Sequence, residues 1–234
     1  MIRFVEVAVI FGGVRAIDSL NAELVAPITG LIGPNGAGKT TLLNVLSGFV
    51  TPKSGEVFLD DHRLSGIAPT GRVKLGLRRT FQQEQVVEEL TVRENILAIA
   101  DHVADRSTAR DDTGRAIEFV GLLGREEMPG VQLNLYERRM VEIAKTLIGN
   151  PRVILLDEPG AGLDEIETRR LLKLLREIPE RFGAQLVVID HDADLIASLC
   201  DETLVLDFGR LLAHGVTRTV LDDARVRRAY LGNA

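Results

Sequence analysis

The chain has 234 residues, of which 45% are apolar, and it carries a formal net charge of −6. This length suits one domain, or one domain with a sizeable insertion, and the apolar share is enough to bury a core. The acidic balance argues mildly against a nucleic-acid-binding protein. The single cysteine excludes an internal disulfide and any cysteine-based metal cluster. Apolar runs stay well short of the roughly 18 residues needed to cross a bilayer, and the N-terminus predicts a strand rather than an export signal.

The first 60 residues predict strands around one short helix. Apolar and β-branched residues predict strands over 2–10 and 24–32, and the second of these leads into a glycine-rich loop. A short helix is predicted over 39–48 and a further strand over 55–60. This order of elements predicts a strand–loop–helix unit close to the N-terminus.

The rest of the chain first changes in character and then returns to alternating strands and helices. From about residue 84 to residue 150, apolar residues recur at helical spacing, which predicts an insertion of two or three helices. After Pro151, short apolar runs predict buried strands, and one amphipathic helix is predicted over 165–181. The predicted strands are 153–156, 186–189 and 203–206. Such alternation predicts a largely parallel sheet with helices on both faces.

Residues 33–40 have the sequence Gly-Pro-Asn-Gly-Ala-Gly-Lys-Thr, which matches the phosphate-loop pattern G-x-x-x-x-G-K-[ST]. The glycines allow backbone N–H groups to point inward at an anion, and the following helix directs its positive dipole end to the same place. Lys39 is expected to reach the β- and γ-phosphates of a nucleotide, and the Thr40 hydroxyl to ligate Mg²⁺. An ordinary glycine-rich turn is the alternative, and the strand before and helix after favour nucleotide binding. The predicted nucleotide-binding residues here are Gly33, Pro34, Asn35, Gly36, Ala37, Gly38, Lys39, Thr40 and Thr41.

Two carboxylates end the buried strand predicted over 153–156. In a parallel sheet, ligands gather at the carboxyl ends of the strands. Asp157 is therefore expected to hold Mg²⁺, and Glu158 to polarise a water molecule against the γ-phosphate. A solvated Asp-Glu-Pro turn is the alternative. The phosphate loop upstream favours the catalytic interpretation.

These two motifs together resemble the P-loop NTPases, and further stretches resemble the ABC ATPases. Phe81-Gln82 resembles the Q-loop of that family, Ala161–Asp164 its D-loop, and Val187–Asp192 its switch-histidine strand. Phe11 lies where an aromatic ring stacks on adenine. The resemblance covers nearly the whole chain, and its motifs occur in the expected order.

The resemblance implies both a fold and roles for single residues. It implies an α/β P-loop NTPase core of residues 1–83 and 151–234, with a mostly parallel sheet and an N-terminal antiparallel β region. Residues 84–150 would form an inserted helical subdomain. Gln82 would contact Mg²⁺ or the attacking water and sense the transporter partner, His191 would contact the γ-phosphate, and Asp164 would act across a dimer interface. Taken singly, the histidine, the glutamine and Phe11 would be ordinary structural residues.

A finer resemblance is to the ATPases of importers for branched-chain amino acids, urea or amides. It is carried by three stretches: Phe11–Ala16, Arg79–Gln82 and Arg227–Gly232. It implies ATP and Mg²⁺ as cofactors and integral-membrane permease subunits as partners. A periplasmic or extracellular solute-binding protein would be an indirect partner, and the chain would lie peripherally on the cytoplasmic face of the membrane. No nucleic-acid partner is expected.

The chain departs from the family at the signature, which in ABC ATPases is Leu-Ser-Gly-Gly-Gln or a near variant. Counting back from Arg138 places the signature at Leu133–Glu137, with Asn134 at the Ser position and Tyr136 at the second Gly. Asn134 still offers a hydrogen-bond donor to nucleotide. A tyrosine is expected to obstruct close approach of a phosphate, and its Cβ to conflict with the dihedral angles required there. The alternative is that the loop is displaced and Tyr136 points away.

The altered signature bears on how the subunits pair. ABC ATPases close as head-to-tail dimers in which each ATP is held between one chain's phosphate loop and the other chain's signature. This chain's own loop, Glu158 and His191 match the family, so the doubtful site is the one that uses its signature. We therefore expect a heterodimer with a second ATPase subunit. Two further functions remain open, a weakly hydrolysing regulatory subunit and an ABC ATPase that acts outside transport.

Overall fold

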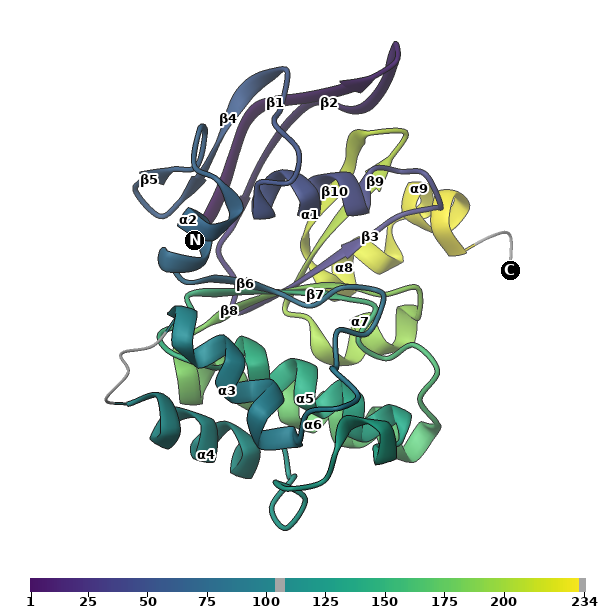
Figure 1. Ribbon diagram of the computed structural model, residues 1–234. Helices are drawn as coiled ribbons and strands as arrows, with labels where there is room; N and C mark the ends of the chain where they lie inside the picture. Colours follow the sequence, from purple (N-terminus) through teal and green to yellow (C-terminus); the bar gives the residue numbers. More distant parts are fainter. Residues whose placement is uncertain (104–107, 232–234) are drawn as a thin grey trace. The chain divides into compact units, whose positions relative to one another are not determined.

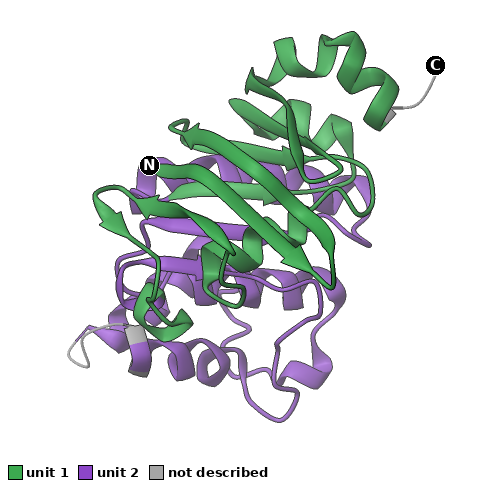
Figure 2. Cartoon of the chain, turned by 90° about the horizontal axis from the view of Figure 1, so that it is seen from above, with its two compact units in different colours: residues 1–72, 185–234 green, residues 73–184 purple. Residues whose placement is uncertain are grey.

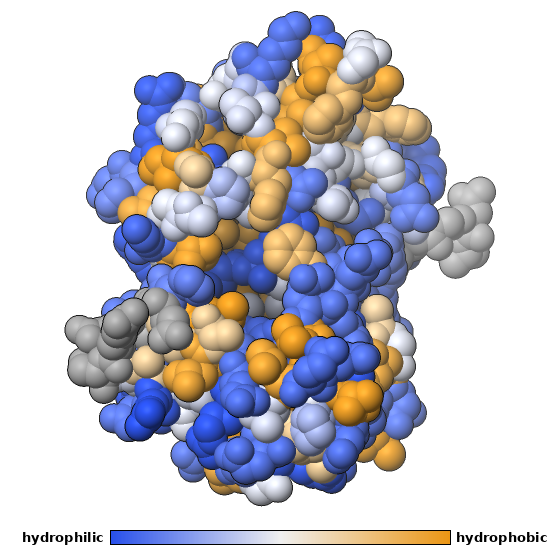
Figure 3. Space-filling view, in the orientation of Figure 1, coloured by the Kyte–Doolittle hydropathy of each residue, from blue (hydrophilic) through white to orange (hydrophobic). Residues whose placement is uncertain are grey.

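The computed structural model describes residues 1–103 and 108–231 (Figure 1). Contacts between Cα atoms divide the chain into two compact units (Figure 2). Unit 1 comprises Met1–Arg72 and Gln185–Ala234, and unit 2 comprises Val73–Ala184. No helix among the described residues is both long and apolar enough to span a membrane. On the face drawn in Figure 3, apolar side chains lie among charged ones.

Unit 1 contains an antiparallel sheet with the strand order β2-β1-β4-β5. The strands are β1 (Ile2–Phe11), β2 (Val14–Leu24), β4 (Ser54–Leu59) and β5 (His62–Arg63). The turn between β1 and β2 is Gly12-Gly13, with φ angles of 52° and 91°. A two-residue hairpin turn of this hand needs positive φ at both positions, which glycine adopts without strain.

Unit 1 also contains four strands of a mixed sheet, in the order β10-β9-β3-β8. Here β3 (Ile28–Ile32) pairs in parallel with β8 (Gln185–Ile189) and with β9 (Glu202–Asp207), and β10 (Arg210–Val216) pairs with β9 antiparallel. Every residue of β3 is buried, as expected for a strand covered on both faces. The helices of this unit are α1 (Lys39–Ser47), α7 (Ala193–Leu199), α8 (Thr217–Asp222) and α9 (Ala224–Val226), and α2 (Pro69–Lys74) spans its boundary.

The predicted strand over 24–32 is wrong as a single element. Val14–Leu24 forms β2, and a new strand begins only at Ile28. Between them Val25 is 64% exposed, and Pro27 has a fixed φ and no N–H to donate to a sheet. The strands β2 and β10 were not among the elements that the apolar pattern predicted.

In unit 2, β6 (Leu77–Arg79) pairs in parallel with β7 (Val153–Asp157). Between these strands the chain forms α3 (Val92–Val103), α4 (Ala109–Phe119) and α5 (Leu135–Thr146), and α6 (Glu165–Phe182) follows β7. The three helices confirm the helical insertion. The α6 helix buries Leu171, Leu175 and Ile178, which lie on one face at spacings of four and three residues.

The α/β class is confirmed, with parallel strands, an antiparallel N-terminal sheet and inserted helices. The division by contacts cuts the chain after Arg72 and after Ala184. The predicted functional boundaries, after residues 83 and 150, divide the chain by role rather than by contacts and stay a prediction.

Candidate nucleotide site

The phosphate loop connects the buried strand β3 to α1 in unit 1. Gly33 has a φ of 148°, and a Cβ at this position would lie 2.1 Å from the backbone oxygen of Leu206. Gly38 has a φ of 104°, and its Cβ would lie 2.4 Å from the backbone oxygen of Ala16. Backbone cannot yield to such overlaps, so these positions admit glycine alone.

Lys39 extends across the inside of this loop. Its Nζ donates to the backbone oxygens of Gly33, at 2.6 Å, and of Pro34, at 3.0 Å. Lys39 is buried, whereas the next residue, Thr40, is exposed. The first N–H groups of α1 have no acceptor within the helix. A buried ammonium and a helix N-terminus at one loop fit the phosphates of a nucleotide.

In unit 2, Asp157 is the last residue of β7 and is buried against the end of β6. Its Oδ2 lies 3.2 Å from Nη2 of Arg79, and both side chains are 6% exposed. Thr80 adds two hydrogen bonds, since its N–H donates to Leu155 O at 2.9 Å and its Oγ1 accepts from the N–H of Asp157 at 3.2 Å. The residues that follow β6 therefore fix the acidic end of β7.

Glu158 follows Asp157 directly and also contacts a residue that follows β6. Its Oε2 accepts a hydrogen bond of 3.3 Å from Nε2 of Gln82, so the two predicted catalytic residues of this unit are in contact. Glu158 also has a φ of 53° and precedes a proline. A left-handed conformation in a residue other than glycine costs about 1–3 kcal/mol and persists only where the surrounding structure imposes it.

Asp164 and Asn134 both begin helices. Oδ1 of Asp164 accepts from the N–H groups of Ile166 and Glu167, each at 2.8 Å, at the start of α6. Oδ1 of Asn134 accepts from the N–H of Glu137 at 2.8 Å, and Oε2 of Glu137 accepts from the N–H of Asn134 at 3.0 Å. Both aspartate and asparagine thus complete capping boxes, which fix where α5 and α6 begin.

His191 and Phe11 belong to unit 1. His191 is exposed in the turn between β8 and α7. Because β8 pairs in parallel with β3, this turn and the phosphate loop follow neighbouring strands at the same edge of the sheet. Phe11 ends β1 and is 51% exposed. The structure thus leaves both rings accessible.

Comparisons with known proteins identify the family. A family model for ABC transporters matches residues 25–161, more than half of the chain. The chain belongs to the ATP-binding subunits of ABC transporters. It is therefore an ATPase that binds ATP, as its family is.

Three relatives show how far the likeness extends. The chain is 35% identical to the high-affinity branched-chain amino acid transport ATP-binding protein LivG of Escherichia coli K12, over 96% of this chain and 94% of that protein. It is 32% identical to the lipopolysaccharide export system ATP-binding protein LptB of Acidithiobacillus ferridurans, over 88% of this chain and 86% of that one. The crystal structure of the ADP conformation of MJ1267, an ATP-binding cassette of an ABC transporter, superposes with a TM-score of 0.88 at 26% identity, covering 100% of this chain and 99% of that one.

The segment predicted as the signature, Leu133–Glu137, leads into α5, which begins at Leu135. Tyr136 lies in the first turn of the helix with ordinary helical backbone. The expected conflict between a Cβ and the dihedral angles is therefore wrong, because the site requires no positive φ. That a tyrosine obstructs a phosphate stays a prediction.

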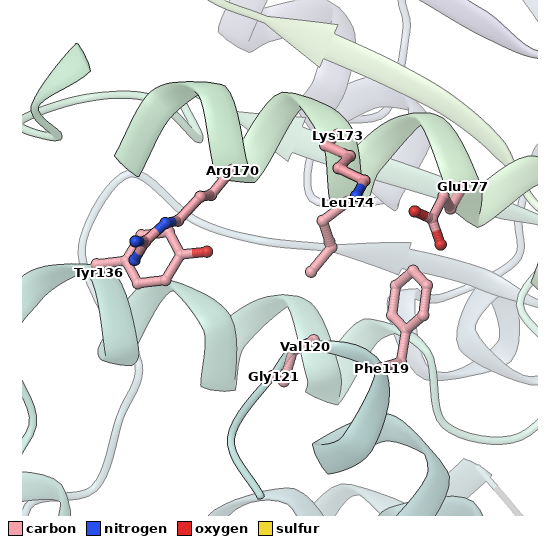
Figure 4. Close-up of a pocket in the computed structure, with 8 residues that line it drawn as sticks. All are labelled: Phe119, Val120, Gly121, Tyr136, Arg170, Lys173, Leu174 and Glu177. Carbon is pink, nitrogen blue, oxygen red and sulfur yellow. The ribbon is translucent and has the colours of Figure 1, made fainter. Parts of the chain in front are cut away.

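The Tyr136 ring is directed toward α6 (Figure 4). It lines a cavity of about 340 Å³ together with Arg170, Leu174 and Phe119. Burial raises the pKa of Tyr136, and the nearby charge of Arg170 opposes that rise. The side chain thus packs within unit 2, beside the helix that Asp164 begins.

The oxygen ligands predicted for Mg²⁺ are the hydroxyl of Thr40, the amide of Gln82 and the carboxylate of Asp157. In the part of the chain that the structure describes, no three His, Cys, Asp or Glu side chains form a metal cluster. Thr40 belongs to unit 1, whereas Gln82 and Asp157 belong to unit 2. Each offers an oxygen of the kind that Mg²⁺ binds, because this ion keeps several waters and takes one or two carboxylates and substrate phosphates.

Sequence reasoning did not assign a site role to Arg79. The residue belonged to a stretch that carried the family resemblance, but its contact with Asp157 joins positions 78 residues apart. No local pattern reports such a contact. An arginine at the end of a short buried strand is the only signal that could have suggested it, because a buried guanidinium needs a carboxylate or carbonyl partner.

Proposed function

We propose that this chain powers an importer for branched-chain amino acids or related small solutes. The likeness to LivG supports this, because it covers almost the full length of both proteins at a higher identity than the likeness to the export protein LptB. The chain would lie on the cytoplasmic face of the membrane, bound to separate permease subunits. A solute-binding protein outside the membrane would deliver the solute to the permease.

In the proposed reaction, water adds to the γ-phosphorus of ATP and the bond to the β-phosphate oxygen breaks, which releases ADP and phosphate. Lys39 and the N–H groups at the start of α1 would hold the phosphates. Glu158 would polarise the attacking water, and Gln82 and His191 would orient the reacting groups. Bound Mg²⁺ would neutralise charge on the β- and γ-phosphates. The observation that best supports this scheme is the 3.3 Å hydrogen bond from Gln82 to Glu158, because it brings together the two residues that would orient and polarise the attacking water.

The solute is tested by reconstituting the chain with its native membrane subunits in vesicles. Leucine, isoleucine or valine, presented on their binding protein, are expected to stimulate ATP hydrolysis and to accumulate inside. Urea and a short amide serve as matched competitors. Accumulation of none of these solutes, or transport outward, would contradict the import proposal.

We further propose that residues 84–150 act as the signature-bearing subdomain and that the working ATPase pair is a heterodimer. Asn134 and Tyr136 support this, because they replace the small residues that approach a phosphate in the family. Purified chain alone is expected to hydrolyse ATP far more slowly than the complete transporter. Equal turnover, together with no effect of Tyr136→Gly, would contradict the heterodimer.

A weakly hydrolysing regulatory role is the second candidate, and the same altered signature favours it. Glu158→Gln in the complete transporter separates the two. If turnover falls, this chain's own site hydrolyses ATP, whereas unchanged turnover would assign hydrolysis to a partner subunit.

A further inference from the structure

The hydroxyl group of Tyr230 lies against the turn that carries His191. It is 2.9 Å from the backbone oxygen of His191 and 3.2 Å from that of Asp190. A phenol has a single O–H, so one hydrogen is shared between two carbonyl acceptors. The contact joins positions 39 and 40 residues apart, both within unit 1.

Two carboxylates of the chain also hold the same turn. Oδ1 of Asp190 accepts from the N–H of Asp192 at 3.0 Å. Oδ1 of Asp192 in turn accepts from the N–H groups of Asp194, at 2.8 Å, and Leu195, at 3.1 Å, and so caps α7. The peptide between His191 and Asp192 is therefore bound at its N–H by Asp190 and at its C=O by Tyr230. Hydrogen bonds at both groups restrict rotation of this peptide plane, and because the plane includes the Cα of His191, they restrict that atom as well.

Tyr230 is itself held in place by the turns that precede it. Oδ1 of Asp223 accepts from the N–H of Arg225 at 2.7 Å and begins α9. The N–H of Arg227 donates to Asp223 O at 2.9 Å, and Val226 is fully buried. These contacts fix the helical turns that precede Tyr230, at the end of the yellow part of the ribbon in Figure 1, and so fix the position of its side chain.

The phenol keeps its proton across the working range of pH. Burial raises the pKa of Tyr230 to about 12, and the charges of Asp190 and Asp192 add to that rise. The group is thus a permanent hydrogen-bond donor toward the turn at neutral pH.

We propose that Tyr230 is a positioning residue for ATP hydrolysis, whose hydroxyl fixes the backbone turn that presents His191. The inference rests on the proposed role of His191 at the γ-phosphate. It makes the C-terminal segment part of the hydrolytic apparatus. Anchoring of the tail alone is the competing explanation, and it predicts a loss of stability without a specific loss of turnover.

The test uses the complete transporter and compares Tyr230→Phe with the natural chain. Loss of one positioning hydrogen bond is expected to lower the turnover number about three- to tenfold with the KM for ATP unchanged, while the melting temperature falls by only about 2–4 °C. Hydrogen exchange at the Asp192 amide is expected to quicken, because the peptide plane loses its second anchor. Arg228→Met is the matched control, because it removes the 3.2 Å bond from Arg228 Nε to Ala224 O on the same tail and keeps the phenol.

A double-variant comparison decides whether Tyr230 acts through His191. If it does, Tyr230→Phe lowers turnover in the natural chain but has no further effect in a His191→Ala background. The inference would be overturned if the two substitutions lowered turnover by independent factors that multiply in the double variant. An equal loss of turnover in Arg228→Met would overturn it as well. If Tyr230→Phe keeps full activity while His191→Ala loses it, the inference about Tyr230 is overturned and the proposed role of His191 stands. Full activity of His191→Ala would overturn the proposed role of the histidine, and the inference with it.

Discussion

Replacing Arg79 by methionine is expected to destabilise unit 2 strongly. The Arg79–Asp157 pair is 3.2 Å long, and each side chain is 6% exposed. Burial lowers the pKa of Arg79, which the charge of Asp157 and its hydrogen bond partly offset. Removing one partner from a buried ion pair costs about 3–5 kcal/mol, because the remaining charge stays out of water. We therefore expect Arg79→Met to lower the free energy of unfolding by about 3–5 kcal/mol.

The assay is urea unfolding followed by far-ultraviolet circular dichroism, because the chain has no tryptophan to report by fluorescence. Arg169→Met is the matched control. Its pair with Glu165 has the same 3.2 Å length, but the side chains are 65% and 85% exposed. An exposed pair contributes about 0–1 kcal/mol. The double variant Arg79→Met/Asp157→Leu is expected to be more stable than the single one, because neither charge of this pair then remains buried. A loss in Arg79→Met no larger than that in Arg169→Met would refute this reasoning.

Three further predictions concern single groups. Asp164→Ala removes the cap of α6 and is expected to lower the free energy of unfolding by about 1 kcal/mol, which corresponds to about 2–4 °C in the melting temperature measured by calorimetry. Asp164→Asn is the control, because asparagine keeps the cap. Equal melting temperatures for the two variants would contradict the capping role. Cys200 is buried, and burial raises its pKa to about 12. Iodoacetamide at pH 8 is therefore expected to label it only when urea unfolds the chain, as followed by mass spectrometry. Labelling of the folded chain as fast as that of the unfolded chain would disprove this. Lys145→Met removes a 2.6 Å bond to Gln85 O, so exchange at the Gln85 amide is expected to quicken, and unaltered exchange would show that the 2.9 Å bond from that amide to Glu142 suffices.

The phosphate loop could be predicted because its constraints are local. Gly33 and Gly38 lie where a Cβ would overlap backbone atoms, so the presence of glycine in the sequence already indicates this geometry. The strand that ends at Asp157 was equally accessible, because a strand buried on both faces is apolar throughout. Residue type and spacing carry this kind of information.

Other features depend on contacts between distant residues and could not be predicted. The strand β10 is only partly buried and pairs with β9, so no apolar run marks it. The roles of Arg79 and Tyr230 depend on partners 78 and about 40 residues away. Whether a Cβ is tolerated at Tyr136 depends on the backbone φ of that residue, which the residue type alone does not reveal. Burial and pairing of single side chains therefore had to come from the structure.

The central claim is that this chain's own site hydrolyses ATP through Glu158. The most direct measurement is steady-state ATP hydrolysis by the complete transporter with Glu158→Gln in this chain, beside ATP binding by the same variant. The glutamine keeps the shape of the side chain and can still meet Gln82, but it cannot accept a proton. We predict that turnover falls at least about 100-fold while ATP still binds. Turnover equal to that of the natural transporter would contradict the account.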